Sequence, residues 1–192
     1  IYNFLDELNE VDGFILKHKS PSCGLGSVKI YYGFEEKVNH FRGRGMFGEA
    51  IVNNYDKFPV EDEGRLRNFS IREQFLSKLF TIAKFREIKK QPEPGKLVDF
   101  HTNNKFLFMA HDQSKMSELG SIVANSEGQK PEKLFEKYEE QMLSLLEIVP
   151  KFTSWINVLQ HAFGFVSDGL NPEEKQFFLK SIEEYRDERI PL

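Results

Sequence analysis

The sequence contains very little cysteine: Cys23 is the single one among 192 residues, so no disulfide can form within the chain. This count excludes a secreted scaffold held together by disulfides, and we expect a protein of a reducing, cytoplasmic compartment. Long apolar runs are also missing, since the longest have about five residues, as in Phe106–Ala110. A membrane span needs ~18–20 such residues, so we expect neither a transmembrane segment nor a targeting peptide.

Charge of one sign is not in excess either. The chain carries 26 basic and 30 acidic side chains, a net charge of −4, which excludes a strongly basic, histone-like protein, and we expect no DNA partner. The two halves differ, because residues 1–91 have a net charge of +2 and residues 92–192 have one of −6. With 40% hydrophobic and 29% charged residues, the composition is that of a globular chain.

Aromatic side chains, by contrast, are abundant. Nineteen Phe, six Tyr and one Trp occur in the chain. We interpret them chiefly as large packing anchors of a helical core, and only secondarily as a platform on which bases could stack.

A cluster of helix-breaking proline and glycine residues divides the chain. Pro92, Pro94 and Gly95 interrupt the helical pattern, which predicts a first domain at residues 1–91, a linker at 92–96 and a second domain at 97–192. The second domain is predicted to be an all-α helical bundle. Its segment Trp155–Val166 is apolar nearly all round, which is typical of a central helix.

The first domain mixes strand and helix patterns. Strands are predicted at 13–17 and 28–32, and helices at 45–55 and from a capping box at Ser70–Glu73 onward. The charged segment Pro59–Leu66 between the two helices is predicted to be irregular. This alternation indicates an α/β domain, a partial doubly wound fold with few strands.

The loop Ser20–Gly24 follows the first predicted strand, and ligands of open α/β sheets bind at the carboxyl ends of strands. Lys17, Lys19 and backbone amides freed by glycines would favour the thiolate form of Cys23 there. Such a thiolate can be a nucleophile, a redox sensor or a metal ligand. A lone cysteine is, however, more often a buried packing residue, and the spacing leaves these alternatives open.

At these residues the chain resembles a known family. Residues Asp12–Gly24 resemble the signature of the TudS-type desulfidases, and Gly43–Phe47 and Pro59–Leu66 match the segments that follow it. The second half resembles the YbgA-like helical domain, which is commonly fused behind the desulfidase domain. That resemblance rests on residues 97–105, 109–111 and 157–161.

The resemblance implies a [4Fe-4S] cluster held by three cysteines, with one iron open to the sulfur of a thiolated uracil. The substrates it implies are free 2- or 4-thiouracil and 4-thiouridine in tRNA. Cys23 matches one cluster ligand, whereas the two others and a catalytic glutamate belong upstream in the family. Because the chain begins at Ile1, within a predicted helix at 1–8, we expect an N-terminally truncated enzyme that does not hold the cluster by itself.

Sulfur removal requires water to add at the thiocarbonyl carbon while hydrogen bonds stabilise the ring oxygen. Lys19, Ser20 and Ser22 are the candidate catalytic donors because they neighbour Cys23 in the sequence. Soft thiolate ligands such as that of Cys23 suit an iron–sulfur cluster.

Further candidates for substrate or RNA contacts are Arg44, Glu63, Arg65, His101 and Lys105. For residues 61–65, a salt-bridged turn that caps the following helix is an equally good interpretation. For His101, a hydrogen-bonded polar seam in the bundle is the better one, and a metal site shared with His111 is awkward because the two lie on different sides of a helix. The net charge of the second half opposes RNA binding.

Three functions therefore compete. The first is an iron–sulfur-dependent desulfidase of thiolated uracil, and the second is a non-catalytic RNA-binding or regulatory protein that has kept the fold. The third is a cysteine hydrolase, which would need His18 or His40 beside Cys23.

Overall fold

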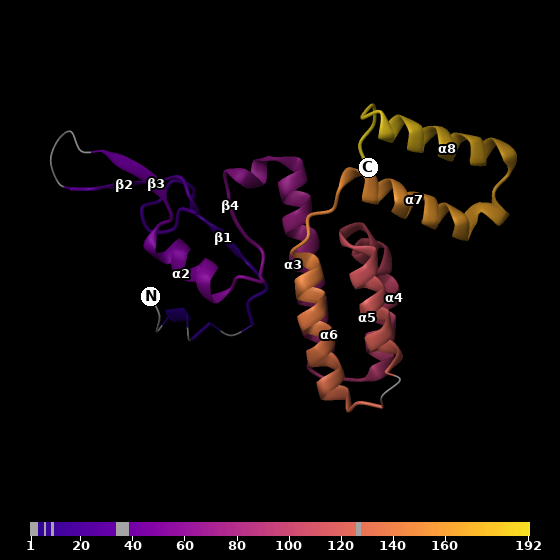
Figure 1. The fold of residues 1–192 in the computed structure, drawn as a ribbon, viewed down its shortest axis with the longest axis horizontal. Helices are drawn as coiled ribbons and strands as arrows, with labels where there is room; N and C mark the ends of the chain where they lie inside the picture. Colours follow the sequence, from indigo (N-terminus) through magenta and orange to yellow (C-terminus); the bar gives the residue numbers. More distant parts are fainter. Residues whose placement is uncertain (1–3, 6, 9, 34–38, 126–127) are drawn as a thin grey trace. The chain divides into compact units, whose positions relative to one another are not determined.

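The computed structural model describes residues 1–192 except 1–3, 6, 9, 34–38 and 126–127. The chain forms two compact units, Ile1–Glu87 and Ile88–Leu192 (Figure 1). The first has few strands and the second is helical, so the predicted fold class is confirmed. The helix expected at residues 1–8 lies partly outside the described residues. Within this segment, Phe4 and Leu5 are helical.

Two parallel strands organise the first unit. Strand β1 (Phe14–Leu16) pairs with β4 (Val60–Asp62), in the register Phe14↔Val60 and Leu16↔Asp62. Parallel neighbours need a crossover connection, and helix α2 (Met46–Asn54) lies within it. The prediction that residues 59–66 are irregular was wrong at β4. This strand forms by pairing with β1, which lies far away in the sequence.

The core of this unit lies between β1 and α2. Leu5, Leu16, Ala50 and Ile51 form its buried cluster. Half-buried side chains pack around this cluster, and they include Phe14, Cys23, Leu25, Phe47, Tyr55 and Val60. The predicted strand at 13–17 and helix at 45–55 thus meet through their apolar faces.

A second strand pair and a long helix complete the first unit. Strand β2 (Val28–Tyr31) pairs antiparallel with β3 (His40–Gly43). After β4 come the 3₁₀ turn η1 (Arg65–Arg67) and helix α3 (Phe69–Lys89). The capping box predicted at Ser70 is wrong, because Asn68 caps α3: its Oδ1 accepts a hydrogen bond from the Ile71 amide at 3.2 Å.

The second unit consists of helices α4 to α8. Helix α4 begins at Pro94, within the segment 92–96 that was expected to be a linker, and the break between α3 and α4 covers residues 90–93. Proline fits the first turn because its missing amide N–H is not needed there. The helices are α4 (Pro94–His111), α5 (Gln113–Ala124), α6 (Pro131–Leu146), α7 (Phe152–Val166) and α8 (Pro172–Arg186), with the 3₁₀ turn η2 (Ser167–Gly169) before α8.

Helices α4, α5 and α6 pack against one another, and α7 packs on α4 and α8 (Figure 1). Phe108, Phe135 and Tyr138 are buried in this unit, as expected of packing anchors. The prediction that α7 is the central helix was wrong, since Phe165 is 71% exposed and only Ile156 and Val158 of α7 are buried. None of the described helices is long and apolar enough to cross a bilayer.

Candidate functional site at the carboxyl ends of β1 and β4

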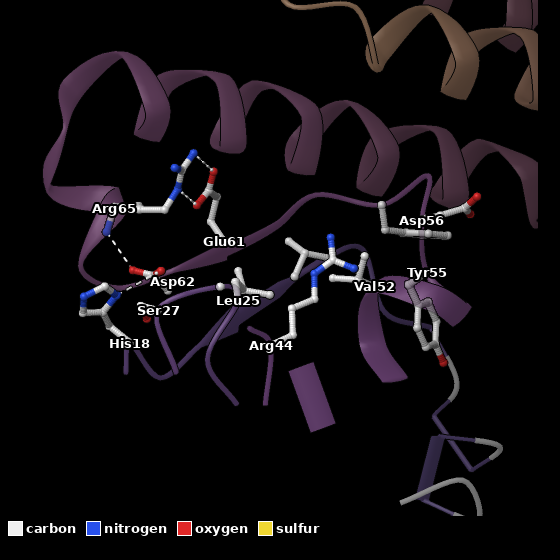
Figure 2. A pocket seen from close by; sticks show the side chains of 13 residues that line it. His18, Leu25, Ser27, Arg44, Val52, Tyr55, Asp56, Glu61, Asp62 and Arg65 are labelled. Carbon is white, nitrogen blue, oxygen red and sulfur yellow. Dashed lines mark hydrogen bonds and ion pairs between the residues drawn. The ribbon is translucent and has the colours of Figure 1, made fainter. Parts of the chain in front are cut away.

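A pocket of about 560 Å³ extends from the carboxyl ends of the two parallel strands, at His18 and Asp62, to Tyr55 and Asp56 after α2 (Figure 2). Open α/β sheets bind ligands at this edge. Its apolar wall consists of Leu25, Val52, Tyr55, Phe58 and Val60. The polar residues that line it are His18, Gly26, Ser27, Arg44, Asp56, Glu61, Asp62 and Arg65.

Asp62 holds His18 at this pocket. The Asp62 side chain is buried, its Oδ2 lies 3.2 Å from Nδ1 of His18, and its Oδ1 accepts a hydrogen bond from the Arg65 amide at 2.8 Å. Burial raises the pKa of Asp62, but the hydrogen bond from the Arg65 amide and the nearby His18 imidazole outweigh burial, and the net pKa is lowered. An ionised Asp62 therefore orients the imidazole, which is half-buried at the pocket wall.

Arg65 and Glu61 form a bidentate ion pair on the same wall. Arg65 Nε lies 2.7 Å and Nη2 3.1 Å from the two Glu61 oxygens, and these hydrogen bonds raise the pKa of Arg65. The sequence left two interpretations of residues 61–65 open, a salt-bridged turn and a part of the pocket. Both describe Glu61 and Arg65, which form an ion pair and line the pocket. Both charges are neutralised by each other.

Glu63 binds the end of β1 rather than the pocket. Its carboxylate accepts hydrogen bonds from Lys17 Nζ and from the His18 amide, both at 2.6 Å. These two hydrogen bonds lower the pKa of Glu63 to about 2. Lys17, expected to act on Cys23, is thus paired with Glu63 at the end of β1.

The loop around Cys23 lies directly on the start of α2. The Ser22 carbonyl accepts hydrogen bonds from the Phe47 amide at 2.9 Å and the Gly48 amide at 3.1 Å. A Cβ atom at Gly45 would lie 2.3 Å from the Ser22 carbonyl oxygen, and one at Gly48 2.7 Å from the carbonyl oxygen of Cys23. These two glycines therefore permit a contact that no other residue allows without a shift of the loop.

The Cys23 side chain itself is half-buried and packs on the core cluster of this unit. Its thiol lies 3.8 Å from Ser22 Oγ, and it is not among the residues that line the pocket. Ser20 Oγ accepts hydrogen bonds from the amides of Ser22 and Cys23, and the Lys19 amide donates to Ser27 Oγ at 3.2 Å. Lys19, Ser20 and Ser22 thus shape the loop, and their catalytic role stays a prediction.

The pocket residues that were not singled out from the sequence include Ser27, Tyr55 and Asp56. Ser27 follows the cysteine loop, and Tyr55 and Asp56 follow α2. They line one pocket because β4 returns to β1, and no local pattern indicated that pairing.

His101 and Lys105 belong to the second unit, apart from Arg44 and Arg65 in the first. His101 Nδ1 lies 3.1 Å from the hydroxyl of Tyr138, which is fully buried. Burial, and then the Lys105 charge, lower the pKa of His101. Lys105 Nζ lies 4.6 Å from the ring centre of Phe165. A polar seam inside the bundle describes these contacts well.

The donor set for a metal is small. Across the part of the chain that the structure describes, no group of three or more His, Cys, Asp or Glu side chains could hold a metal ion. Cys23 supplies one thiolate where a [4Fe-4S] cluster with an open iron needs three cysteines. The described residues therefore do not by themselves fit such a cluster.

Fold and site together define a small α/β unit with a pocket, followed by a helical unit. Residues 1–63 match the family model described as 2-thiouracil desulfurase, and residues 105–192 match that of a protein of unknown function, DUF1722. The uncharacterized protein YbgA of Escherichia coli (strain K12) is 27% identical over 119 residues, which are 61% of this chain and 70% of YbgA. No solved structure matches significantly. The resemblance to a TudS-type domain followed by a YbgA-like domain is thereby confirmed.

Proposed function

We propose that this chain is the substrate-binding part of a desulfidase that removes sulfur from thiolated uracil, as the free base or within tRNA. One observation carries the proposal: the residues that match 2-thiouracil desulfurase, 1–63, include β1, the cysteine loop, α2 and β4. The same residues provide all of the pocket lining except Arg65. The family match and the pocket thus coincide.

The reaction replaces sulfur by oxygen: water adds at the thiocarbonyl carbon, and the carbon–sulfur bond breaks to release hydrogen sulfide. The chain can hold the substrate, because Leu25, Tyr55 and Phe58 form an apolar wall suited to a pyrimidine ring. His18, oriented by Asp62, is placed to accept a proton at its other ring nitrogen. The [4Fe-4S] cluster that the family resemblance implies would need more thiolates than that of Cys23 to hold it.

The test uses the complete open reading frame, purified and reconstituted with iron and sulfide without oxygen. We expect visible absorption of a cluster and loss of 4-thiouridine from tRNA or of free thiouracil. Replacing Cys23 by Ala should abolish both signals. Unchanged substrate in the presence of a fully loaded cluster would refute the proposal.

A non-catalytic RNA-binding or regulatory protein is the second candidate. It is favoured by the half-buried Cys23 and by its position outside the pocket lining. In that case the complete protein would bind thiouridine-containing tRNA without iron and leave its sulfur in place. The cysteine hydrolase has less support, because His18 pairs with Asp62 and the His40 ring lies against Tyr31.

A further inference from the structure

We propose that the hairpin of β2 and β3 is a docking surface for single-stranded RNA, with Lys29 and Arg42 on the phosphates and the rings of Tyr31 and His40 against a base. These four residues are called the basic–aromatic face below. The choice of RNA over DNA rests on the proposed function, whereas the surface rests on the side chains of the hairpin. None of the four lines the pocket, so the hairpin would hold the RNA chain outside it.

Lys29 and Arg42 lie directly opposite each other in the hairpin. The Tyr32 amide donates to the Asn39 carbonyl at 3.3 Å, which makes these two residues a hydrogen-bonded pair of the ladder. Such pairs alternate with non-hydrogen-bonded ones, whose Cα atoms lie only about 4.5 Å apart. Lys29 and Arg42 form a pair of this second kind, so their side chains stand side by side on one face.

This like-charge pair has no counter-ion. Both side chains are exposed, and within the described part of the chain neither has a hydrogen-bond or ion-pair partner. Like charges at opposite positions of two strands destabilise a hairpin, whereas a polyanion that contacts both turns the repulsion into attraction. An anionic partner therefore explains the pair better than the stability of the hairpin does.

The next pair on the same face is aromatic. Tyr31 and His40 lie opposite each other, two residues along their strands from Lys29 and Arg42, so all four side chains point to the same side. The two ring centres lie 5.5 Å apart, and Tyr31 is 56% exposed. Exposed rings beside cations bind single-stranded nucleic acids by stacking on their bases. An acidic peptide would use the cations and leave the rings without a role.

The opposite face of the hairpin holds it to the first unit. Val28 is buried, and its side chain lies so close to the cysteine loop that a Cβ atom at Gly24 would be 2.4 Å from it. Ile30, on the same side as Val28, is half-buried. The four residues of the basic–aromatic face are all exposed, and Figure 1 shows the hairpin extending past α2. A flexible strand of RNA can therefore reach this face without any rearrangement of the unit.

The experiment measures the fluorescence anisotropy of a labelled oligouridylate of about ten nucleotides as the 192-residue chain is added. The Lys29→Gln/Arg42→Gln double variant should bind at least about tenfold more weakly at low salt. The slope of log K against log salt concentration should become shallower by about 0.7 for each lost cation. Wild-type affinity and slope in the double variant would overturn the proposal.

The ring of Tyr31 is tested separately from the charges. Tyr31→Ala should weaken binding by about 5- to 100-fold, as expected for the loss of one stacked base, and should leave the salt slope unchanged. Tyr31→Phe keeps the ring and should retain most of the affinity. An equal loss in the Ala and Phe variants would contradict stacking.

The matched control is Arg67→Gln, which removes the same charge from an exposed residue of η1 in the same unit. It should bind the oligouridylate as the wild type does, and a loss equal to that of Arg42→Gln would overturn the proposal. Urea unfolding checks the fold of every variant. Because Lys29→Gln relieves the repulsion with Arg42, it should unfold at the same or a higher urea concentration than the wild type.

Two further probes test the identity of the partner. Polyglutamate should not displace the oligouridylate at equal charge concentration, and full displacement would assign the face to an acidic protein instead. Oligodeoxyuridylate should bind more weakly, and equal or tighter binding would overturn the choice of RNA. The probes carry no sulfur, so the result is independent of desulfidation. If the complete protein desulfurises thiouracil while the double variant binds oligouridylate normally, the proposed function stands and this inference fails.

Discussion

The imidazole of His18 and the carboxylate of Asp62 lie 3.2 Å apart. Asp62 is the last residue of β4, and His18 lies two residues after the end of β1, its parallel partner strand. Asp62 is 3% exposed, while His18 reaches the pocket. This pair joins the pairing of β1 and β4 to the chemistry of the site, because any change that separates the strands also releases the imidazole.

Replacing Asp62 by Asn should destabilise the protein by about 1–3 kcal/mol at neutral pH, because a buried hydrogen-bonded charge is lost. The pKa of Asp62 in the folded protein is below its usual 3.8, so its stabilisation is complete above that value and lost as pH falls through the lower folded pKa. Urea unfolding at neutral pH and in steps below pH 4 measures both effects. A variant with the full acid sensitivity of the wild type would contradict this.

Replacing Gly45 by Ala should displace the cysteine loop, since the new Cβ would lie 2.3 Å from the Ser22 carbonyl oxygen. We expect a loss of about 1–3 kcal/mol and faster alkylation of Cys23 by a thiol reagent. Gly164→Ala in α7 is the control, because nothing lies within 4 Å of its Cβ position. That variant should be neutral or stabilised by up to about 1 kcal/mol. Equal behaviour of the two would disprove the close contact.

His101 should make the stability of the helical unit depend on pH. Its pKa is lowered from 6.5 by burial and by Lys105, so the unfolded chain takes up the proton first as pH falls below that value. Stability should therefore decrease with falling pH, and less steeply in His101→Gln. Tyr138→Phe should instead cost about 0.5–1.5 kcal/mol at every pH, by removing one hydrogen bond. Parallel slopes in wild type and His101→Gln would argue against a buried neutral imidazole.

Buried and exposed phenylalanines should differ clearly in their contribution to the free energy of unfolding. Phe108 is fully buried, and Phe108→Ala should cost about 3–5 kcal/mol. Phe177 is 75% exposed, and Phe177→Ala should stay within about 0.5 kcal/mol of the wild type. Urea unfolding followed by the fluorescence of Trp155, which lies in the same unit, gives both values. A large loss in Phe177→Ala would mean that this side chain is covered in solution.

The sequence predicted the elements that form through their own apolar spacing, and missed those that depend on a distant partner. Strand β1 and helix α2 show apolar spacing of their own, and both form within about a residue of the expected bounds. Strand β4 has Val60 as its single apolar residue and is a strand because β1 pairs with it. Helix α7 was placed at the centre of the bundle from its composition alone, but its far end has too few neighbours to cover it.

The same distinction applies to the site. Arg44 and Arg65 were singled out and line the pocket, while Glu63 was singled out and pairs with Lys17 instead. Glu61 and Asp62 are neighbours in β4 and both line the pocket, whereas Glu63 follows the strand and pairs with Lys17. No local pattern distinguishes Asp62 from Glu63, because the difference depends on where β4 ends against β1.

The register Phe14↔Val60 also has a consequence for synthesis on the ribosome. The cysteine loop, the hairpin of β2 and β3, and α2 all lie between these two residues, and the parallel pair cannot close until Val60 has left the exit tunnel. Until Val60 has been synthesised and released, the nascent chain would expose the apolar faces of β1 and α2. Chaperones that recognise such faces could bind it during this time.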